Sequence, residues 1–263
     1  MTCEDDVEAR GLLATLVGTE QWQYAQTDRN GATHTVTRTE ELPRVPIQLL
    51  GPTVFRAGRG ASIDFTIPVP ALGPATFEGT VSRLSWELEI GLDVPGVDRR
   101  INVPVRILQP TALLRAGVLD LPAFALYPSA DAADGDITGS IALEPVPLCP
   151  GRPFSGSVSV TPAEALELQE IRLEIVLHAK ATVASGLKED KTLWAGRIAE
   201  PVRLEGQTTT SFEVSGVLAP GAWPSSRLPH GAADTKVRVV LARAWARDAH
   251  LERDVAICTT TEI

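Results

Sequence analysis

Apolar and polar residues alternate with a period of two over most apolar stretches of this chain. The clearest case is TVSRLSWELEIGLDV (80–94), in which Leu84, Trp86 and Leu88 share one face and Arg83 lies on the other with two glutamates. Such alternation predicts a half-buried antiparallel strand with one wet face. Trp86 is central on the apolar face, so we expect it to anchor the core of its domain.

The same alternation predicts strands in other segments, with two less regular exceptions. The segments are 63–67, 101–107, 154–160, 171–183, 235–245 and 251–257. The threonines of THTVTRT (33–39) share one face and leave little to bury, which indicates an edge strand or a protruding hairpin. Residues 162–180 are rich in helix formers behind Pro162, but alternation from Ile171 favours a strand, with a short helical turn at 163–168 left open.

Glycine and proline punctuate the whole chain. The 21 glycines and 20 prolines are spread along 263 residues, a spacing typical of short strands joined by turns rather than of long helices. The sequence therefore predicts an all-β protein, and its length suits one large or two ordinary domains.

Two stretches share one layout and indicate an internal repeat. DFTIPVPALGPATFEG and the following VSRLSWELEIGLDVPGVDRRINVPVRI (64–107) correspond to SFEVSGVLAPGAWPSSRLPHG and KVRVVLARAWARDAHLERDVAI (211–257). Each copy has a strand, a proline-rich crossing, a long strand, a turn with an aspartate, and a closing strand. Upstream, GLLATLVGTEQWQY (11–24) takes the place of EIRLEIVLHAKATV (170–183).

The second copy has earlier strands that the first copy lacks. GDITGSIALEPVPLCPGRPFSGSVSV (135–160) is typical of a strand, a turn and a second strand, and nothing before Val7 corresponds to it. We therefore expect two domains, 1–110 and 111–263, the first an incomplete sandwich without its opening strands. Three explanations are open: a true start upstream of Met1, which we favour, strands donated by a partner chain, or closure with fewer strands.

On these residues the chain resembles the arrestin clan, which comprises arrestins, α-arrestins, retromer-type sorting subunits and bacterial sporulation-control proteins. The segment 135–160, the closing strands WELEIGLDVPGVDRRINVPVRI and the proline-rich lead into them carry the resemblance, which extends over nearly the whole chain. It implies two tandem immunoglobulin-like β-sandwiches that form a protein–protein scaffold with no catalytic site and no cofactor. No tail follows Ile263, and the buried charge cluster of visual-type arrestins cannot be mapped onto this chain, so we do not expect their tail-release switch.

Charge and cysteine content limit the partners and the compartment. The 24 basic and 33 acidic residues give a net charge of −9, which disfavours nucleic acid and membrane surfaces because binding them needs a basic face. Cys3, Cys149 and Cys258 are odd in number and widely spaced, which is typical of a reducing compartment without disulfides. No apolar run approaches the ~18 residues of a membrane helix. We expect a cytoplasmic protein without an integral membrane segment.

No group of residues has the spacing of a catalytic or metal site. The histidines lack a ligand spacing such as HExxH and are expected to be exposed strand or turn residues. They are His34, His178, His230 and His250. DAADGD (131–136) fails the calcium-loop spacing and is typical of a solvated linker. Cys149, in PLCPG, is interpreted as an inert turn thiol, and Glu87 and Glu89 as part of a wet strand face.

Arg243 is a charged residue at an unexpected position, on an otherwise apolar strand face. It shares that face with Val239, Leu241 and Trp245. The more common interpretation is a strand-end arginine whose long side chain reaches solvent. The alternative is a charge pair at the domain interface, which would hold the relative orientation of the two domains.

The sequence thus favours a non-catalytic adaptor or scaffold that binds a protein of unknown identity through strand edges and loops. Strand addition to an open edge needs the least rearrangement, because the edge already offers unpaired backbone groups. One alternative is a self-assembling structural sandwich protein whose incomplete first domain forms a homo-oligomer. The other is a ligand-binding or enzymatic sandwich module, which lacks support because no nucleophile or acid/base set is recognisable.

Overall fold

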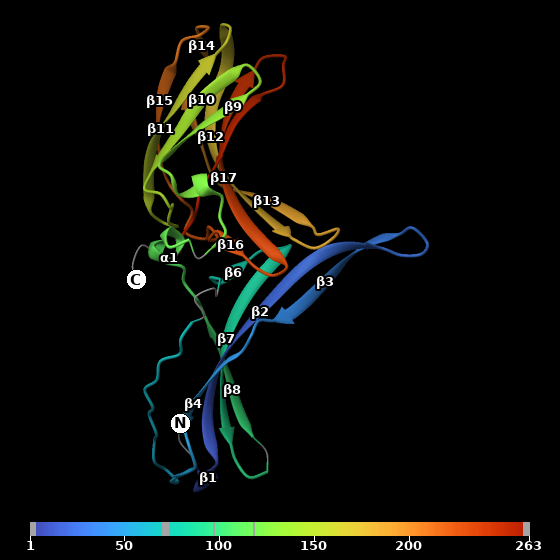
Figure 1. The fold of residues 1–263 in the computed structure, drawn as a ribbon, viewed down its shortest axis with the longest axis vertical. Helices are drawn as coiled ribbons and strands as arrows, with labels where there is room; N and C mark the ends of the chain where they lie inside the picture. Colours follow the sequence, from blue (N-terminus) through green and yellow to red (C-terminus); the bar gives the residue numbers. More distant parts are fainter. Residues whose placement is uncertain (1–3, 70–73, 97, 118, 260–263) are drawn as a thin grey trace.

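Two groups of β-strands, one from each half of the chain, make up the computed structural model of the protein (Figure 1). It describes residues 4–69, 74–96, 98–117 and 119–259. The predictions for Met1, Cys3 and the end of the chain lie outside these ranges. We name the groups the first module (β1–β8) and the second module (β9–β18). The boundary that we place near residue 110 falls in the connection between the last strand of one and the first of the other.

The first module consists of one six-stranded antiparallel sheet and a separate pair of short strands. The sheet has the order β3-β2-β7-β6, with β4 pairing with β2 and β8 with β7, while β1 pairs with β5. Its strands are β1 (Val7–Ala9), β2 (Gly11–Thr27), β3 (Thr33–Glu41), β4 (Val45–Leu50), β5 (Thr53–Phe55), β6 (Phe77–Glu78), β7 (Ser82–Asp93) and β8 (Arg99–Val105).

The second module has two sheets that pack face to face. A four-stranded sheet has the order β15-β11-β10-β9, and a six-stranded sheet the order β13-β12-β17-β16, with β14 pairing with β12 and β18 with β17. The strands are β9 (Ser129–Asp134), β10 (Ile137–Glu144), β11 (Pro153–Pro162), β12 (Leu166–Ala181), β13 (Lys188–Ala199), β14 (Val202–Leu204), β15 (Thr210–Val217), β16 (Ser226–Arg227), β17 (Gly231–Arg243) and β18 (Ala249–Asp254).

The large sheets of the two modules have the same connectivity, which confirms the internal repeat. Strands β2, β3, β4, β6, β7 and β8 of one take the positions of β12, β13, β14, β16, β17 and β18 of the other. The register agrees as well, since Ala14 pairs with Ile90 in the first module and Leu173 with Val239 in the second. The alignment of residues 11–24 with 170–183 places Ala14 opposite Leu173, as this register requires.

Alternation along the strands creates the core of each module. In the second module Leu173 and Ile175 of β12 and Val237 of β17 meet Ile141 and Val158 of the small sheet in one continuous cluster. The first module has two smaller clusters, one around Leu84 and Trp86 and another around Leu12 and Leu92. The second module adds a smaller cluster around Leu114 and Cys258, but its main cluster is much larger than either cluster of the first module.

The all-β prediction is confirmed among the described residues, where the helical elements are short. They are α1 (Thr111–Arg115) and the 3-10 helix η1 (Ala123–Leu126). The strand predicted from Ile171 is confirmed as part of β12, which already begins at Leu166, so the possible helical turn at 163–168 does not form. DAADGD is a tight hairpin between β9 and β10 rather than a linker, and its Asp-Gly pair is a hairpin signal that the linker interpretation overlooked.

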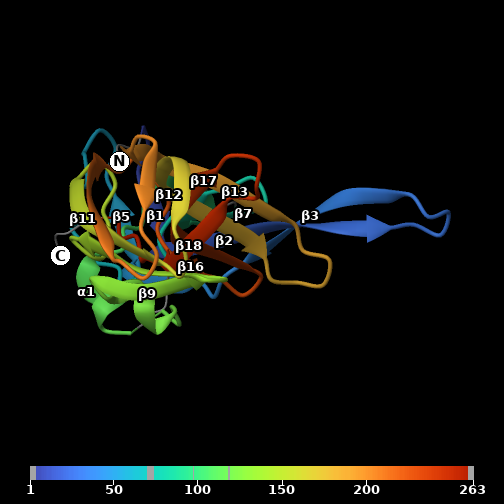
Figure 2. The same ribbon diagram turned by 90° about the horizontal axis from the view of Figure 1, so that it is seen from above.

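The edge strand or protruding hairpin predicted for THTVTRT is also confirmed. The ends of β2 and β3 form an arm that projects away from both modules (Figure 2). Nearly every residue of β3 is exposed. Its threonines and charged residues suit a ribbon that has water on both faces.

The prediction of an incomplete first module is confirmed, with two corrections. Strand β1 precedes β2 as β11 precedes β12, so the strands without a counterpart among the described residues are β9 and β10, not the segment 135–160 as a whole. The strand predicted over Ile63, Phe65 and Ile67 does not form. Strand β5 follows β4 and pairs with β1, as β15 follows β14 and pairs with β11. The counterpart of β15 is therefore the short β5 and not residues 63–67, which the sequence alignment placed opposite it.

Candidate functional site: an open face and the module junction

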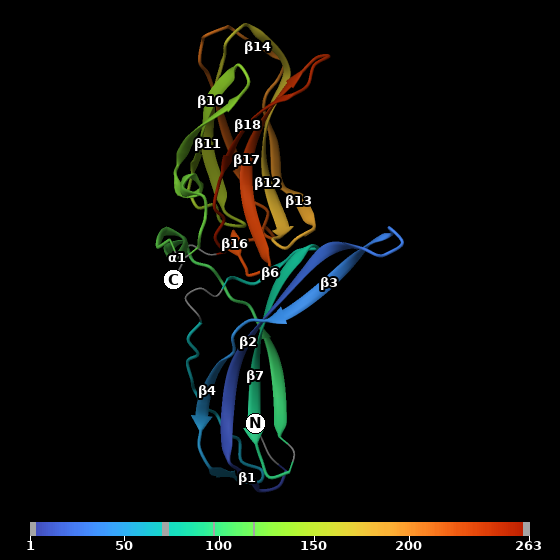
Figure 3. The ribbon, with the colours of Figure 1, turned by 45° about the vertical axis from the view of Figure 1, so that its right-hand side comes forward.

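The face of the first module that should lie inside a sandwich is partly exposed at β7 and β8. Ile90 pairs with Ile101 and Leu88 with Val103, so these four side chains lie on one side of the sheet. Ile101 is 60% exposed and Val103 41%. In Figure 3 the green strand beside β7 is β8, which pairs with β7 and lies at the edge of the sheet. We name Leu88, Ile90, Ile101 and Val103 the open face.

The second module buries the same positions under β9 and β10. The repeat of 98–107 as 248–257 equates Ile101 with Leu251, which is 0% exposed, and Val103 with Arg253, which is 5% exposed. Contacts of β18 with β9 and β10 provide the cover. Gly139 of β10 leaves room for the Leu251 side chain, since a Cβ added to that glycine would lie 2.9 Å from Leu251 Cδ1. The open face is therefore exposed because the described part of the first module has no strands that correspond to β9 and β10.

Arg253 holds the cover strands of the second module to β18. Its Nη1 donates to the carbonyl oxygen of Ile141 in β10 at 3.0 Å, and its Nη2 to that of Tyr127, before β9, at 2.8 Å. Burial lowers the pKa of this guanidinium. A buried arginine is tolerated here because backbone carbonyls replace the water it loses. The matching residue in the first module, Val103, offers no such anchor.

Backbone hydrogen bonds join the two modules where β2 passes the β12–β13 loop. The amide of Ala25 donates to Ser185 at 2.9 Å, and the amide of Leu187 donates to Gln23 at 3.1 Å. Nearby, the Thr80 amide donates to Oε2 of Glu189 at 2.9 Å. These contacts fix the loop against the base of the arm, so the orientation of the modules depends on ordered groups rather than on a linker alone.

A buried carboxylate forms the centre of this junction. The Glu20 side chain, 1% exposed, accepts the backbone N–H of His230 at 3.0 Å and lies 3.2 Å from its Nδ1. The Trp22 ring stacks on the imidazole, with ring centroids 3.9 Å apart. Burial raises the pKa of the Glu20 carboxyl, and the hydrogen bonds from His230 only partly oppose it. His230 is thus a junction residue, not the exposed turn residue expected from the sequence.

The two residues singled out on the sequence lie in different places. Trp86 is 2% exposed and packs with Leu84 and Phe77, and its indole Nε1 donates to the carbonyl of Pro74 at 3.1 Å. Arg243 lies at the end of β17 opposite to the junction, where its Nε donates to the carbonyl of Arg247 at 2.8 Å. The charged contact at the junction is made by Glu20 and His230 instead.

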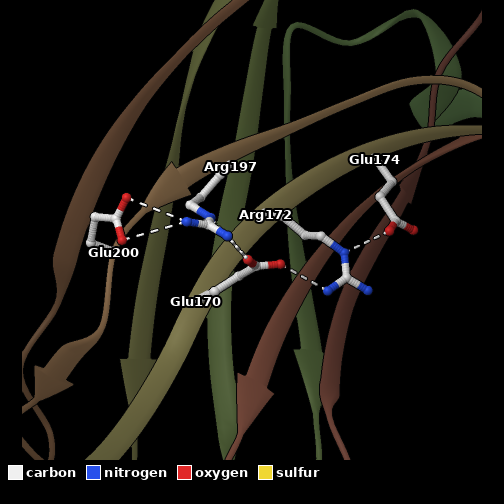
Figure 4. A network of polar contacts seen from close by, with 5 residues as sticks. All are labelled: Glu170, Arg172, Glu174, Arg197 and Glu200. Carbon is white, nitrogen blue, oxygen red and sulfur yellow. Dashed lines mark hydrogen bonds and ion pairs between the residues drawn. The ribbon is translucent and has the colours of Figure 1, made fainter.

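The outer face of the second module carries a ladder of ion pairs (Figure 4). Arg172 bonds Glu174 at 2.8 Å and Glu170 at 3.0 Å, while Arg197 bonds Glu170 at 2.9 Å and Glu200 at 3.4 Å. Hydrogen bonds from Arg172, and then the charge of Arg197, lower the pKa of Glu170 although partial burial opposes this. A charged ladder keeps this face wet, so it is a poor candidate for docking another sheet.

The remaining candidates for chemistry form no reactive group. Cys149 and Cys258 are buried and free. Burial, helped by the neighbouring Cys258, raises the pKa of Cys149 to about 11, so its thiol stays protonated and unreactive. Among the described residues, no three His, Cys, Asp or Glu side chains are placed to hold a metal ion. A groove of about 980 Å³ beside η1 is lined by Tyr127, Pro145 and Phe154, and neither histidine nor cysteine lines it.

Sequence reasoning missed Arg253, Glu20 and His230. Arg253 follows Leu251 and precedes Val255 on one face of LERDVAI, the same signal that drew attention to Arg243. Glu20 likewise lies on the apolar face of β2, between Leu16 and Trp22. The pairing of Glu20 with His230, 210 residues apart, had no local signal.

Comparison with known proteins gives a partial match to a solved structure. No family model matches the sequence, and no curated protein matches it. Within the described part, no helix is both long and apolar enough to cross a membrane. Among solved structures, the crystal structure of Spo0M, a sporulation control protein from Bacillus subtilis, matches with 15% identity and a TM-score of 0.40, over 47% of this chain and 50% of that one. The match thus extends over about half the length of each chain.

Proposed function

We propose that the protein is a non-catalytic adaptor that binds another protein at the open face of its first module. The observation that carries this proposal is the exposure of Ile101 and Val103 at positions where the second module is covered. Apolar side chains gathered on one sheet face favour association, since burying them removes apolar area from water at about 25 cal/mol per Å².

The rest of the molecule supports a rigid carrier for such a surface. The junction of Glu20 with His230 holds the modules in one arrangement, which keeps the open face at a fixed position relative to the arm. The free, buried thiols of Cys149 and Cys258 support a reducing, cytoplasmic compartment. A preorganised surface binds more tightly because less freedom is lost on association.

Affinity capture with matched variants tests this function. Ile101→Glu places a charge on the open face, and Leu13→Glu places one on the other side of the same sheet, where Leu13 is 44% exposed. We expect proteins captured by the wild type to be lost with Ile101→Glu and kept with Leu13→Glu. Equal capture by all three would contradict the proposal.

Self-assembly is the second function that the open face favours, because two copies could cover each other. Gel filtration at several protein concentrations separates the two. A dimer that forms with rising concentration and disappears in Ile101→Glu would support assembly, and a monomer at all concentrations would support the adaptor.

A further inference from the structure

The second module shows what kind of element covers the open face. Its β9–β10 hairpin lies over β18 and also pairs through β10 with β11, the strand that precedes the large sheet. In the first module β1 has the position of β11, and its pairing is with β5 alone among the described residues. One edge of β1 and the adjacent open face thus correspond to the two surfaces that the hairpin covers in the second module.

We propose that the open face accepts a β-hairpin from a partner protein, which adds to the vacant edge of β1 and lies over Ile101 and Val103. This inference rests on the proposed function and names the partner's chemistry. Strand addition supplies backbone hydrogen bonds, and alternate side chains of the added strand enter the core. The same molecule displays that geometry at β10, where Ile137, Ile141 and Leu143 are buried.

The pattern of the donated strand follows from β10. Its buried side chains recur at alternate positions, with a small residue, Gly139, where Leu251 packs. Because Ile101 corresponds to Leu251, a donor needs a small residue at the matching position and branched apolar residues on either side. A bulky side chain there would meet Ile101 as it would meet Leu251, so the pattern discriminates among donors.

The charges beside the open face also indicate which residue the turn of the donor hairpin should carry. In the second module Asp134, at the hairpin end of β9, accepts the backbone N–H of His250 at 2.8 Å. The position of His250 corresponds to Arg100, next to Arg99. Within the part of the chain that the structure describes, no ion pair includes the exposed Arg99, whereas Arg100 pairs with Glu89. An acidic residue at the turn of the donor hairpin would therefore lie close to Arg99 and could form an ion pair with it.

The hairpin of the second module supplies the probe. A synthetic peptide of residues 129–144 has the required alternation, the glycine and the acidic turn. The control peptide carries Ile141→Ser and Leu143→Ser, which removes two of the buried side chains and leaves the net charge unchanged. Each peptide is added to the purified full chain, and backbone hydrogen exchange and the fluorescence of a dye that binds apolar surface are measured.

We expect the wild-type peptide to slow hydrogen exchange at Val7–Ala9 and to reduce the dye fluorescence. The control peptide should have neither effect. Ile101→Glu should also abolish the effects, while Leu13→Glu should keep them. Arg99→Glu should weaken binding in low salt and less so in high salt, because it reverses an exposed charge. Ile101 and Arg99 are exposed, so these variants should fold.

Peptide binding without slower exchange at β1 would overturn the inference, and so would a failure of the wild-type peptide to bind at any concentration tested. If affinity capture is nevertheless lost with Ile101→Glu, the proposed adaptor function remains supported, and only the proposal that the partner binds through a β-hairpin is contradicted. Concentration-dependent dimers that protect β1 without peptide would identify a second copy as the occupant and would also overturn the inference.

Discussion

The large sheets of the two modules have the same topology, but they fill the space above the sheet from different strands. At one pair of facing positions the first module has Gly18 opposite Trp86, and the second has Leu177 opposite Thr235. A Cβ on Gly18 would lie 2.8 Å from the Trp86 ring. Large and small residues are exchanged across the pair, so the first module fills its interior from one strand with a single indole.

This exchange explains how a module without cover strands keeps a core. An indole buries as much area as two smaller side chains and holds the proline-rich segment through its hydrogen bond to Pro74. At the other end of β7 no aromatic residue is available, and Leu88 and Ile90 face the exposed side chains of β8. In the described part of the first module, the indole of Trp86 thus fills the space that cover strands would occupy at one end of β7. At the open face no described side chain does so.

The largest expected effect is the loss of Trp86. Trp86→Ala should destabilise the first module by about 3–5 kcal/mol, since it removes a buried ring and leaves a cavity beside Gly18. Thermal unfolding followed by circular dichroism should show an early transition for the variant, with the second module unfolding as before. An unchanged melting midpoint would show that the ring is not an anchor.

A pair of substitutions at matching positions should differ strongly. Leu251→Ala should cost about 2–5 kcal/mol because Leu251 is fully buried. Ile101→Ala should change stability by less than about 0.5 kcal/mol because its side chain is mostly exposed. Urea unfolding of both variants measures the difference. If both substitutions lowered the free energy of unfolding by a similar amount, the faces around Leu251 and Ile101 would be equally covered, which would contradict the difference between the modules.

Much of this contrast could be predicted from the sequence, because period-two alternation is a local signal. The strand containing Trp86, the long strand from Ile171 and the repeat itself follow from residues close together in the chain. The cover of Leu251 and the anchor of Arg253 could not be predicted, since both depend on which strands lie above a face. The segment at Ile63 has strand alternation but no partner, and pattern alone does not reveal a missing partner.

The junction should respond to pH through Glu20. Burial raises the pKa of this carboxyl in the folded protein above its ordinary value, so its protonated form favours folding. That contribution is fully present below the unfolded pKa and is lost as pH rises through the folded pKa. The neutral amide of Glu20→Gln does not ionise, so the variant does not lose stability at this position as pH rises. The free energy of unfolding of the variant, relative to the wild type, should therefore increase from about pH 4 to pH 7.

Urea titrations at several pH values give this difference, and Glu87→Gln, on the exposed outer face of β7, serves as the matched control. A constant difference between Glu20→Gln and the wild type across the range would show that the junction does not hold a buried carboxylate. The second module alone offers no equivalent of this contact, so the effect reports on how the modules are joined.

The smallest expected effect lies in the arm. Val36 of β3 pairs with Tyr24 and is only partly buried. Val36→Thr keeps the β-branched shape and should change the melting midpoint little, by about 0.5 kcal/mol or less. A large loss of stability, measured by thermal unfolding, would mean that the arm packs against the modules and does not project freely.

Hydrogen exchange at two matching strands tests the central claim most directly. Strands β8 and β18 each pair with one neighbour, so their backbone pairing is alike and only the cover differs. In the purified chain we expect the amides of residues 99–103 and of Val105 to exchange faster than those of Ala249–Asp254, because local opening is easier where few apolar contacts hold a strand. Equal or slower exchange in β8 would contradict an open face in the first module.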